Sequence, residues 1–528
     1  MSTAWPRARM GSGLAHPAVF ERRLGELLLT VLTAAVPAVT ALAITIAMPN
    51  VSLLAVLAVL AGVVAVVALM VCSRLEVTVT FIVIYLGLLD GPVKLFFSAR
   101  EATASIQDII IIAVCAGALL RMAVRRERVT LPALSGWVIA WVLLVVVNAF
   151  NPRTEGVLHV LGGFRQQLQY VPFFFFGYVL MRSKRRFRQL FIIVGVIALA
   201  NGAVAAYQTE LSPAQLASWG PGYHNLVYAP GSGSGRVYFS EGEARVRPPG
   251  LGSEAGSSGA IGHIALPMCL ALFAIARGRR KWIAALFSLG AIMAVIVGLG
   301  RLQLIGAALG VLAFAGLAVL GGRQFSRAMG TLLAIVVLAI PVGAVVVSSL
   351  RSGTFKRYES INTSSETTLH KEAAWSKIPK YVEASPLGFG LGNSGPVSGF
   401  GGKANTNLLE GHGLTSETEY NVLVKELGAP GLLLWPLLAI YISVLVARRM
   451  RRVRDGELAI CLAGALAAFI PLPIEGSSAF ISGGASSGAY YWFAIGVAAY
   501  WFAGPGLAAA RGLMRGRNDA ETLAPVPA

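Results

Sequence analysis

Apolar stretches of about 20 residues recur along this chain of 528 residues, from Leu27 to Ala503. A helix of that length crosses the hydrocarbon core of a bilayer, where lipid offers no partners for backbone polar groups. Charged residues make up only 13% of the chain, against about 25% in soluble domains. The sequence therefore predicts an all-α fold, a polytopic membrane helical bundle with about 14 transmembrane helices and two long extracytoplasmic loops.

The apolar runs also divide the chain. The predicted spans lie near 27–48, 51–72, 78–97, 105–121, 131–150, 164–181, 189–208, 257–277, 282–299, 302–321, 328–349, 420–447, 457–474 and 487–504. The regions they define are a basic N-terminus (1–26), N-terminal helices (27–208), a first long loop (209–256), central helices (257–349), a large loop (350–416), C-terminal helices (417–504) and a tail (505–528). Within the first long loop, Val237 to Phe239 predicts a short strand.

The basic residues set the predicted orientation. The net charge is +19, from 44 Lys and Arg against 25 Asp and Glu, and the excess falls in short segments between spans. The main clusters are 121–128, 182–188, 277–281, 323–327, 448–454 and 511–517. Counting spans from a cytoplasmic N-terminus places every cluster, and the C-terminus, on the cytoplasmic side. We therefore expect a multi-pass protein of the cytoplasmic (inner) membrane that contacts membrane lipids and binds no nucleic acid.

The four cysteines, Cys72, Cys115, Cys269 and Cys461, all fall inside apolar segments. Their spacing fits neither a metal site nor a disulfide framework, so we interpret them as small apolar core residues and predict no metal site.

Two acidic residues in predicted spans call for structural explanations. Asp90 and Lys94 are four residues apart and predict an ion pair on one helical face. Asp108 is predicted to open a span, where a carboxylate suits the helix dipole.

Three arginines fall at one predicted depth, on the side away from the basic clusters. Arg165 opens a span, Arg247 lies in Arg-Pro-Pro-Gly just before the span that begins near 257, and Arg301 lies at a turn between two spans. Each alone suits lipid phosphate, but together they predict a clamp for a phosphate or pyrophosphate, because guanidinium binds such oxygens in bidentate fashion.

The large loop supplies the candidates for proton transfer. Glu417 lies where the loop meets the following helix, and His412 is close by. A carboxylate or imidazole beside arginines can act as a general base. We expect the ends of the spans beginning near Ser257 and Glu419, and the turn at Arg301, to converge on one cavity beneath the loop.

Several short motifs occur in a fixed order between residues 105 and 475. They are Asp108 early in a span, Arg165 before the aromatic run Tyr170 to Phe176, Arg247-Pro248-Pro249-Gly250, Arg301, Lys371 with Trp375, the glycine-dependent turn Pro386 to Gly392, and Glu426-Leu427-Gly428-Ala429-Pro430-Gly431. In these motifs and their order the chain resembles the O-antigen ligase and polymerase superfamily of bacterial membrane glycosyltransferases. The Glu-hydrophobic-Gly-x-x-Gly pattern is the most specific match.

The resemblance implies transfer of a glycan from a polyprenyl-pyrophosphate-linked donor to a glycan or lipid acceptor hydroxyl, at the outer face of the membrane. It implies a metal-independent enzyme without a cofactor. Family ligases have a His eleven residues before the first glycine of the last motif, and Glu417 occupies that position here. Lys371 and Tyr420 complete the predicted substrate-binding set with the three arginines.

Two other classes of protein stay open. A lipid-linked oligosaccharide flippase or another polytopic transporter would also have about 14 spans, with charges expected along a central cavity at mid-membrane depth. A structural membrane protein leaves the three arginines at one depth unexplained.

Overall fold

The structure is a computed structural model. It describes residues 62, 64–72, 74–96, 102–124, 131–154, 156–228, 237–240, 243–322, 375–397, 418–477 and 479–510. The chain divides into two compact units, one of Met1–Thr78, Ile109–Thr130 and Ala528, the other of Val79–Asp108 and Leu131–Pro527. In the first unit, Arg121 donates a hydrogen bond to the carbonyl of Met70 at 2.6 Å.

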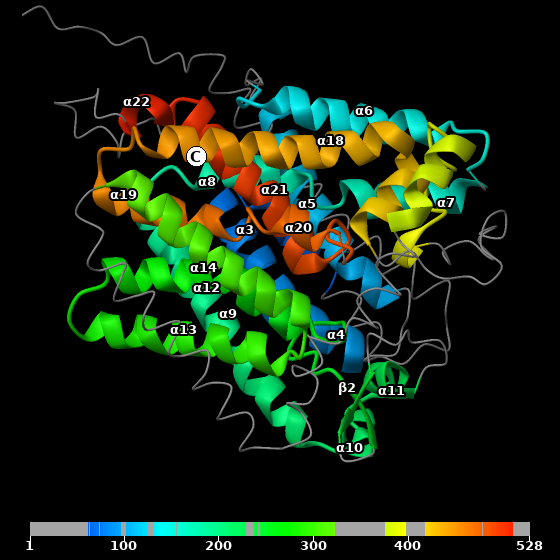
Figure 1. The fold of residues 1–528 in the computed structure, drawn as a ribbon, viewed down its shortest axis with the longest axis horizontal. Coiled ribbons are helices and arrows are strands. Elements are labelled where there is room, and N and C mark those ends of the chain that lie inside the picture. Colours follow the sequence, from blue (N-terminus) through cyan, green and yellow to red (C-terminus); the bar gives the residue numbers. More distant parts are fainter. Residues whose placement is uncertain are drawn as a thin grey trace, which may run out of the picture. The chain divides into compact units, whose positions relative to one another are not determined.

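The described chain is almost entirely helical (Figure 1). Up to the hairpin the elements are α3 (Leu75–Ile84), η1 (Tyr85–Leu89), α4 (Asp90–Phe96), α5 (Ala102–Val124), α6 (Ser135–Ala149), α7 (Gly156–Leu168), α8 (Pro172–Leu180), α9 (Lys184–Glu210), α10 (Pro213–Ala217) and α11 (Pro221–Tyr228). Strands β1 (Val237–Ser240) and β2 (Glu243–Val246) then pair antiparallel, with Val237 opposite Val246. The short strand predicted from Val237 to Phe239 is confirmed.

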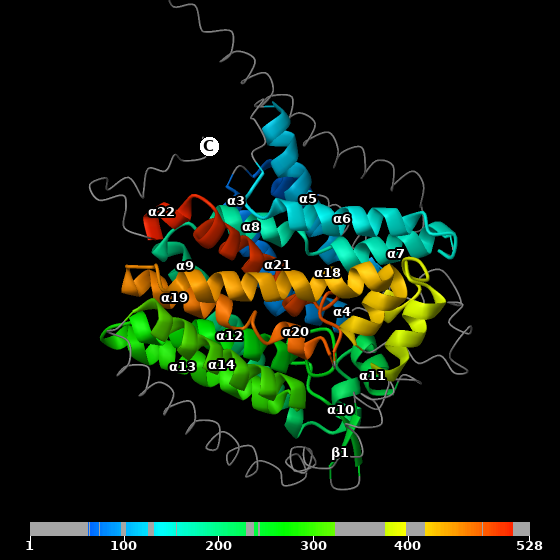
Figure 2. The same ribbon diagram turned by 45° about the horizontal axis from the view of Figure 1, so that its top comes forward.

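The remaining elements carry the central and C-terminal helices. They are α12 (Ser257–Ile275), α13 (Arg279–Val297), α14 (Arg301–Gly321), η4 (Gly395–Val397), α18 (Glu419–Met450), α19 (Gly456–Ala467), α20 (Leu472–Glu475), α21 (Ala485–Ala498), η6 (Ala499–Ala503) and α22 (Gly506–Ala510). Residues 375–384 are also helical. In Figures 1 and 2, this segment lies beside α7 and the beginning of α18.

Eight helices of the described chain are long and apolar enough to cross a membrane. Each of them overlaps a predicted span, so the all-helical, multi-pass class follows from the structure as well as from the sequence. The predicted spans 27–48 and 328–349 lie outside the described residues, and 51–72 is described only in part.

One predicted span is wrong as drawn. The run 164–181 is not one helix, because α7 ends at Leu168 and α8 begins at Pro172. Proline lacks the N–H that would continue the helical ladder, and the last turn of α7 is polar. The break places a buried tyrosine, Tyr170, between the two helices.

Helix α12 is the centre of the second unit. It packs against α9, α13, α14 and α19, and 78% of its apolar stretch is buried, as for the stretch that covers α19 and α20. A helix that is apolar all round is expected in such a central position.

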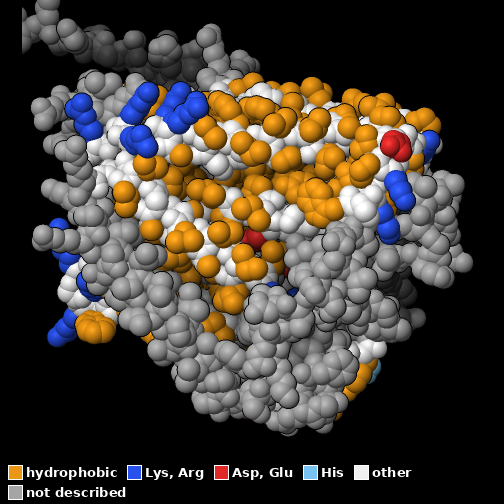
Figure 3. Space-filling view, in the orientation of Figure 1, with side chains coloured by type: hydrophobic (Ala, Val, Ile, Leu, Met, Phe, Trp, Pro, Cys, Tyr) orange, Lys and Arg blue, Asp and Glu red, His pale blue; other side chains and the backbone are white. Residues whose placement is uncertain are grey.

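The basic residues at the start of α9 and at the end of α18 gather at one end of the second unit, beside the acidic start of α19. Lys184, at the start of α9, pairs with Asp455 at 2.8 Å, and Arg188 pairs with Glu457. Gly321, at the end of α14, lies against Met450 at the end of α18. Figure 3 shows lysine and arginine side chains along that edge and a largely apolar face between the edges. Because α14 runs from Arg301 to this end, its arginine lies at the opposite end.

Candidate active site

The segment that carries Arg247 is fixed to two helices by buried side chains. Gln208 of α9 accepts from the Gly250 N–H at 2.8 Å and donates to the Gly250 carbonyl at 3.1 Å. Asn201, about two turns earlier on α9, accepts from the Leu251 N–H at 2.9 Å. On the other side, the hydroxyl of Ser258 donates to the Pro248 carbonyl. Gly250 has φ +64, which a glycine adopts without strain.

Gly256 lies beside both Arg247 and the turn that leads into Arg301. A Cβ placed on Gly256 would lie 3.2 Å from the Gly298 carbonyl oxygen and 3.6 Å from a terminal nitrogen of Arg247. The guanidinium and the turn therefore flank the same glycine. Within this turn Leu299 is fully buried with φ +53, an uncommon conformation for a β-carbon-bearing residue. We call residues 298–301 with the side chain of Arg247 the arginine turn.

Arg301 is the first residue of α14, and its N-cap is Gly300. The side chains of Arg247 and Arg301 are both half-buried. The arginine turn therefore combines two guanidinium groups with the positive end of a long helix, an arrangement that favours a phosphate oxygen.

The third predicted arginine is engaged elsewhere. Nε of Arg165 lies 2.8 Å from Oδ2 of Asp108, and Oδ1 of the same carboxylate accepts from Gln169. The prediction that Asp108 opens a helix is wrong, because α5 begins six residues earlier at Ala102. Asp108 is instead the partner of Arg165, and this pair joins α5 to α7.

The predicted pair of Asp90 and Lys94 is confirmed at 2.9 Å, with Asp90 only 2% exposed. Lys94 also donates to Gln107 at 2.8 Å, and Gln107 donates to the Tyr170 hydroxyl at 3.2 Å. A continuous polar network therefore joins α4, α5 and the break between α7 and α8.

The two glycine-rich motifs of the sequence lock together. The Phe389 N–H donates to the Lys425 carbonyl, and the Ala429 N–H donates to the Pro386 carbonyl. Gly428, with φ +66 and ψ −158, leaves room for this approach, since a Cβ there would lie 2.2 Å from the Pro386 oxygen. The glycine-dependent turn is confirmed by φ values of +87, +95 and +73 at Gly388, Gly390 and Gly392.

Glu426 is the centre of that junction. Its fully buried carboxylate accepts from Gln166 at 3.0 Å, from Gln167 at 2.8 Å and from the Gly392 N–H at 3.1 Å. With three donors in place, this carboxylate holds α7, α18 and the 385–397 segment together.

The start of α18 is fixed by Glu419 and Tyr420. The buried Glu419 carboxylate accepts from the N–H groups of Ile481 and Ser482, and from the Ser482 hydroxyl. The Tyr420 hydroxyl donates to the Pro473 carbonyl at 2.7 Å, and its ring packs against Trp375. Tyr420 therefore anchors the segment before α21, and its predicted substrate contact stays a prediction.

A buried pair of ionisable groups joins α12 to α20. Nε2 of His263 lies 3.4 Å from a carboxylate oxygen of Glu475, and the two residues are 1% and 3% exposed. A Cβ on Gly306 of α14 would lie 1.9 Å from the same oxygen. Residues near the starts of α12, α14 and α18 therefore meet at Glu475 and Gly476, whereas the cavity predicted beneath the large loop stays a prediction.

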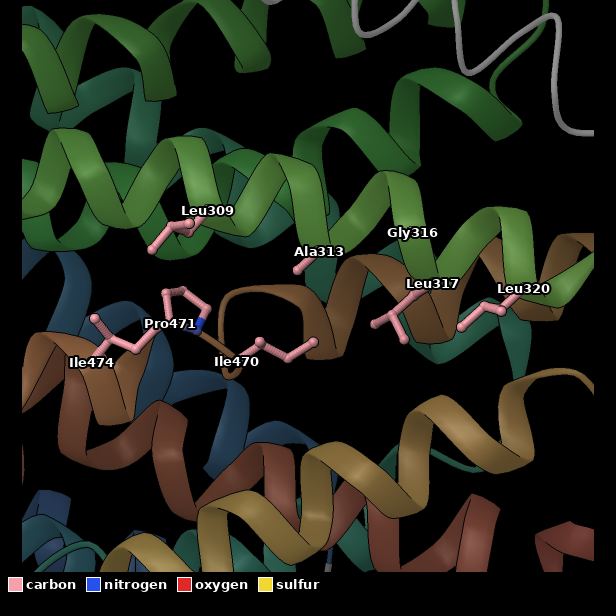
Figure 4. Close-up of a pocket in the computed structure, with 8 residues that line it drawn as sticks. All are labelled: Leu309, Ala313, Gly316, Leu317, Leu320, Ile470, Pro471 and Ile474. Atoms are coloured by element: carbon pink, nitrogen blue, oxygen red, sulfur yellow. The ribbon is translucent and has the colours of Figure 1, made fainter.

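A groove lies farther along α14, as Figure 4 shows. Its volume is about 300 Å³, and it is lined by Leu309, Ala313, Gly316, Leu317, Leu320, Ile470, Pro471 and Ile474. All of these are apolar or lack a side chain, so the groove has no group that can take part in bond making or proton transfer.

The structure thus places the Arg247 guanidinium and the turn before Arg301 beside the same residue, Gly256, and joins Tyr420 to α20 through Pro473. Glu417, His412 and Lys371 lie outside the described residues. Sequence reasoning missed the His263–Glu475 pair and the glutamines that hold Glu426. An ionisable residue within an apolar span was the available signal for His263.

Among the described residues, no three His, Cys, Asp or Glu side chains are placed to hold a metal ion. No protein family, curated protein or solved structure significantly matches the chain. Fold and site together define a multi-pass helical membrane protein with an arginine turn and buried carboxylates away from the basic start of α9 and end of α18.

Proposed function

We propose that this protein is a membrane glycosyltransferase that ligates or polymerises a glycan from a polyprenyl-pyrophosphate-linked donor onto an acceptor hydroxyl, at the outer face of the cytoplasmic membrane. The observation that carries the proposal is the arginine turn, in which the Arg247 guanidinium and the turn preceding Arg301 both lie beside Gly256. A pyrophosphate diester carries charge in the donor and gains more as it leaves, which two guanidinium groups at a helix N-terminus favour.

The orientation in this proposal follows from charge. Arg182 to Arg188, Arg448 to Arg454 and the start of α19 share the end opposite the arginine turn. A cytoplasmic location of the basic end places the arginine turn outside, where a lipid-linked donor supplies the activated glycan.

In the proposed reaction the acceptor oxygen attacks the anomeric carbon of the donor glycan, and the bond from that carbon to the pyrophosphate oxygen breaks. The polyprenyl pyrophosphate leaves with the electron pair, and a general base takes the acceptor proton. Glu417 and His412 are the sequence-based candidates for that base. The interlocked motifs at Pro386–Gly392 and Glu426–Gly431 support the proposal, because both belong to the pattern that resembles the glycosyltransferase superfamily.

The test is glycan transfer by purified protein in liposomes containing a polyprenyl-pyrophosphate-linked oligosaccharide and envelope acceptors, with and without a chelator. Arg247→Lys and Arg301→Lys keep the charge but lose the planar fork. Losing one charge-assisted hydrogen bond of about 1.5–3 kcal/mol corresponds to a roughly tenfold to hundredfold loss in kcat/KM. Arg280→Lys, at the basic end, is the matched control. Wild-type rates in both arginine variants contradict the site.

A lipid-linked oligosaccharide flippase is the second candidate, because buried ionisable groups such as His263 and Glu475 inside a helix bundle are also typical of transport pathways. The liposome assay separates the two functions. A flippase moves labelled donor between leaflets without forming a glycosidic bond, whereas the proposed enzyme yields product without net movement of donor.

A further inference from the structure

Two ionisable side chains, His263 of α12 and Glu475 of α20, meet inside the bundle and have no role in the glycosyl transfer proposed so far. The ring nitrogen Nε2 lies 3.4 Å from the Glu475 carboxylate oxygen Oε1. We propose that this pair is a proton-accepting dyad in which Glu475 orients His263, and His263 is the general base for the acceptor hydroxyl. The inference rests on the proposed glycosyl transfer and assigns its proton to residues that the sequence patterns did not identify.

The His263–Glu475 pair is buried. His263 is 1% exposed and Glu475 is 3% exposed. Within the described chain, both ring nitrogens of His263 and Oε1 of Glu475 are buried without a hydrogen-bond partner. Buried polar atoms are nearly always hydrogen-bonded, so three such atoms at one place call for a ligand or a chemical role. Ionisable groups within membrane helices are likewise retained chiefly for function.

The neighbouring helix is shaped to fit this pair. Gly306 of α14 faces Glu475, and a Cβ there would lie 1.9 Å from Oε1 and 2.8 Å from the carboxyl carbon. Any larger residue must displace the carboxylate from His263. Farther along the same helix, a Cβ placed on Gly316 would meet nothing within 4 Å, so the close fit is specific to Gly306.

The ionisable groups on the surrounding elements are otherwise engaged. Glu419 of α18 accepts from Ile481 and Ser482, and its neighbour Tyr420 donates to the Pro473 carbonyl. Tyr490 of α21 donates to the Ala465 carbonyl. Arg301 opens α14, and Cys461 is a buried thiol on α19. Among these described groups, the imidazole of His263 is the chemical type best suited to proton transfer near neutral pH.

The pair lies near the arginine turn. Gly306 follows Arg301 by five residues, a helical rise of roughly 7–8 Å. A Cβ placed on Gly259 of α12, one turn before His263, would lie 3.3 Å from Cβ of Gln303, two residues after Arg301. An acceptor held at His263 is therefore within the reach of a sugar ring from a pyrophosphate held by Arg301. The irregular backbone around α20 fits this position, because such backbone in a membrane is buried in protein or lines a polar cavity.

The chemistry follows from the arrangement. Nε2 faces the Glu475 carboxylate, so Nδ1 is the nitrogen left to accept a proton. As the acceptor oxygen attacks the anomeric carbon, its proton passes to Nδ1, and the pyrophosphate leaves with the electron pair of the broken bond. The carboxylate stabilises the imidazolium that forms. The proton is then released to water or to the departing pyrophosphate, and the imidazole returns to its starting form.

The experiment uses the full-length protein in liposomes with the polyprenyl-pyrophosphate-linked oligosaccharide named above. We expect His263→Ala and His263→Gln to lower kcat by roughly 10²–10⁴-fold, the usual contribution of general-base catalysis, with the donor KM little changed. We expect Glu475→Gln to lower kcat less. Gly306→Ala leaves every ionisable group in place, and we expect it to lower kcat about tenfold or more, whereas Gly316→Ala is the silent control.

Two readouts separate a base from a structural role. The fall in wild-type kcat at acidic pH should disappear in His263→Gln, and added imidazole should restore part of the turnover of His263→Ala. Protection of the buried thiols of Cys269 and Cys461 checks that each variant is folded. If His263→Ala misfolds, His263→Gln and Gly306→Ala carry the test.

The outcomes are distinguishable. If the wild-type protein forms no glycosidic bond, the proposed function fails, and this inference fails with it. If the wild type is active and the folded His263 variants keep its rate across the pH range, the dyad alone is overturned. If instead Glu417→Gln removes the acidic limb and His263→Gln does not, the base is Glu417 and the dyad is also overturned.

Discussion

Replacing Glu426 by alanine removes the carboxylate that joins α18 to α7 and to the 385–397 segment. Glu426 is fully buried and accepts from Gln166, Gln167 and the Gly392 N–H. Gln166 has a second acceptor, the Ser394 carbonyl at 3.3 Å. The alanine variant therefore leaves two buried donors without acceptors, Nε2 of Gln167 and the Gly392 N–H.

The magnitude follows from these two donors. An unsatisfied buried polar group costs about 1–3 kcal/mol, so the change should lower the free energy of unfolding by roughly 2–6 kcal/mol. Glu426→Gln should cost less than about 1.5 kcal/mol. Its amide keeps one acceptor oxygen, and its NH₂ group can donate to Oε1 of Gln167, which is unpartnered among the described atoms.

The assay uses the buried cysteines. Cys269 and Cys461 are fully buried, so a thiol-reactive fluorescent dye reports their exposure as the detergent-solubilised protein unfolds. The half-buried Cys72 and Cys115 are first replaced by serine. Glu457→Ala is the control, because Glu457 belongs to a partly exposed ion pair, worth about 0–1 kcal/mol.

Two results contradict this prediction for Glu426. An alanine variant as stable as the Glu457 control means that Glu426 does not hold the three segments together. Equal, large losses in Glu426→Gln and Glu426→Ala mean that the negative charge, rather than the number of acceptors, determines the stability of the junction.

Three further predictions use the same thiol assay. Gly428→Ala should lower the free energy of unfolding by about 1–3 kcal/mol from its backbone conformation alone, with a further clash against the Pro386 carbonyl, whereas Gly456→Ala meets nothing within 4 Å and should be neutral. Asn201→Ala should lower the free energy of unfolding by about 1–3 kcal/mol for each buried group that it leaves without a partner, the Leu251 N–H and the Gly87 carbonyl. The same change should raise the donor KM because it loosens the segment that carries Arg247. An unchanged donor KM contradicts the kinetic prediction. Burial acts to raise the pKa of Asp455, but the hydrogen bonds from Lys184 and from two backbone N–H groups hold this pKa below its ordinary 3.8. The stabilisation that Asp455 gives is therefore present above pH 3.8 and is lost as the pH falls through the lowered pKa. Asp455→Ala should cost about 1 kcal/mol at pH 7 and Asp455→Asn less, because Asn still caps α19.

The sequence alone determines the features whose causes are local. Runs of about 20 apolar residues determine the helices, because each helix satisfies its own backbone within a bilayer. The ion pair of Asp90 and Lys94 is readable because residues four apart share a helical face. The turn at Gly388 to Gly392 is readable because closely spaced glycines allow positive φ.

The tertiary structure decides which distant polar groups meet. Glu426 and Gln166 are 260 residues apart, and nothing in their local sequences pairs them. The partners of Asp108 and Glu475, Arg165 and His263, depend in the same way on how helices pack. A buried charge signals from the sequence that a partner is needed, but its identity depends on which helix faces overlap. For Glu475 the packing of α12, α14 and α20 decides it, and for Asp108 the packing of α5 against α7 does.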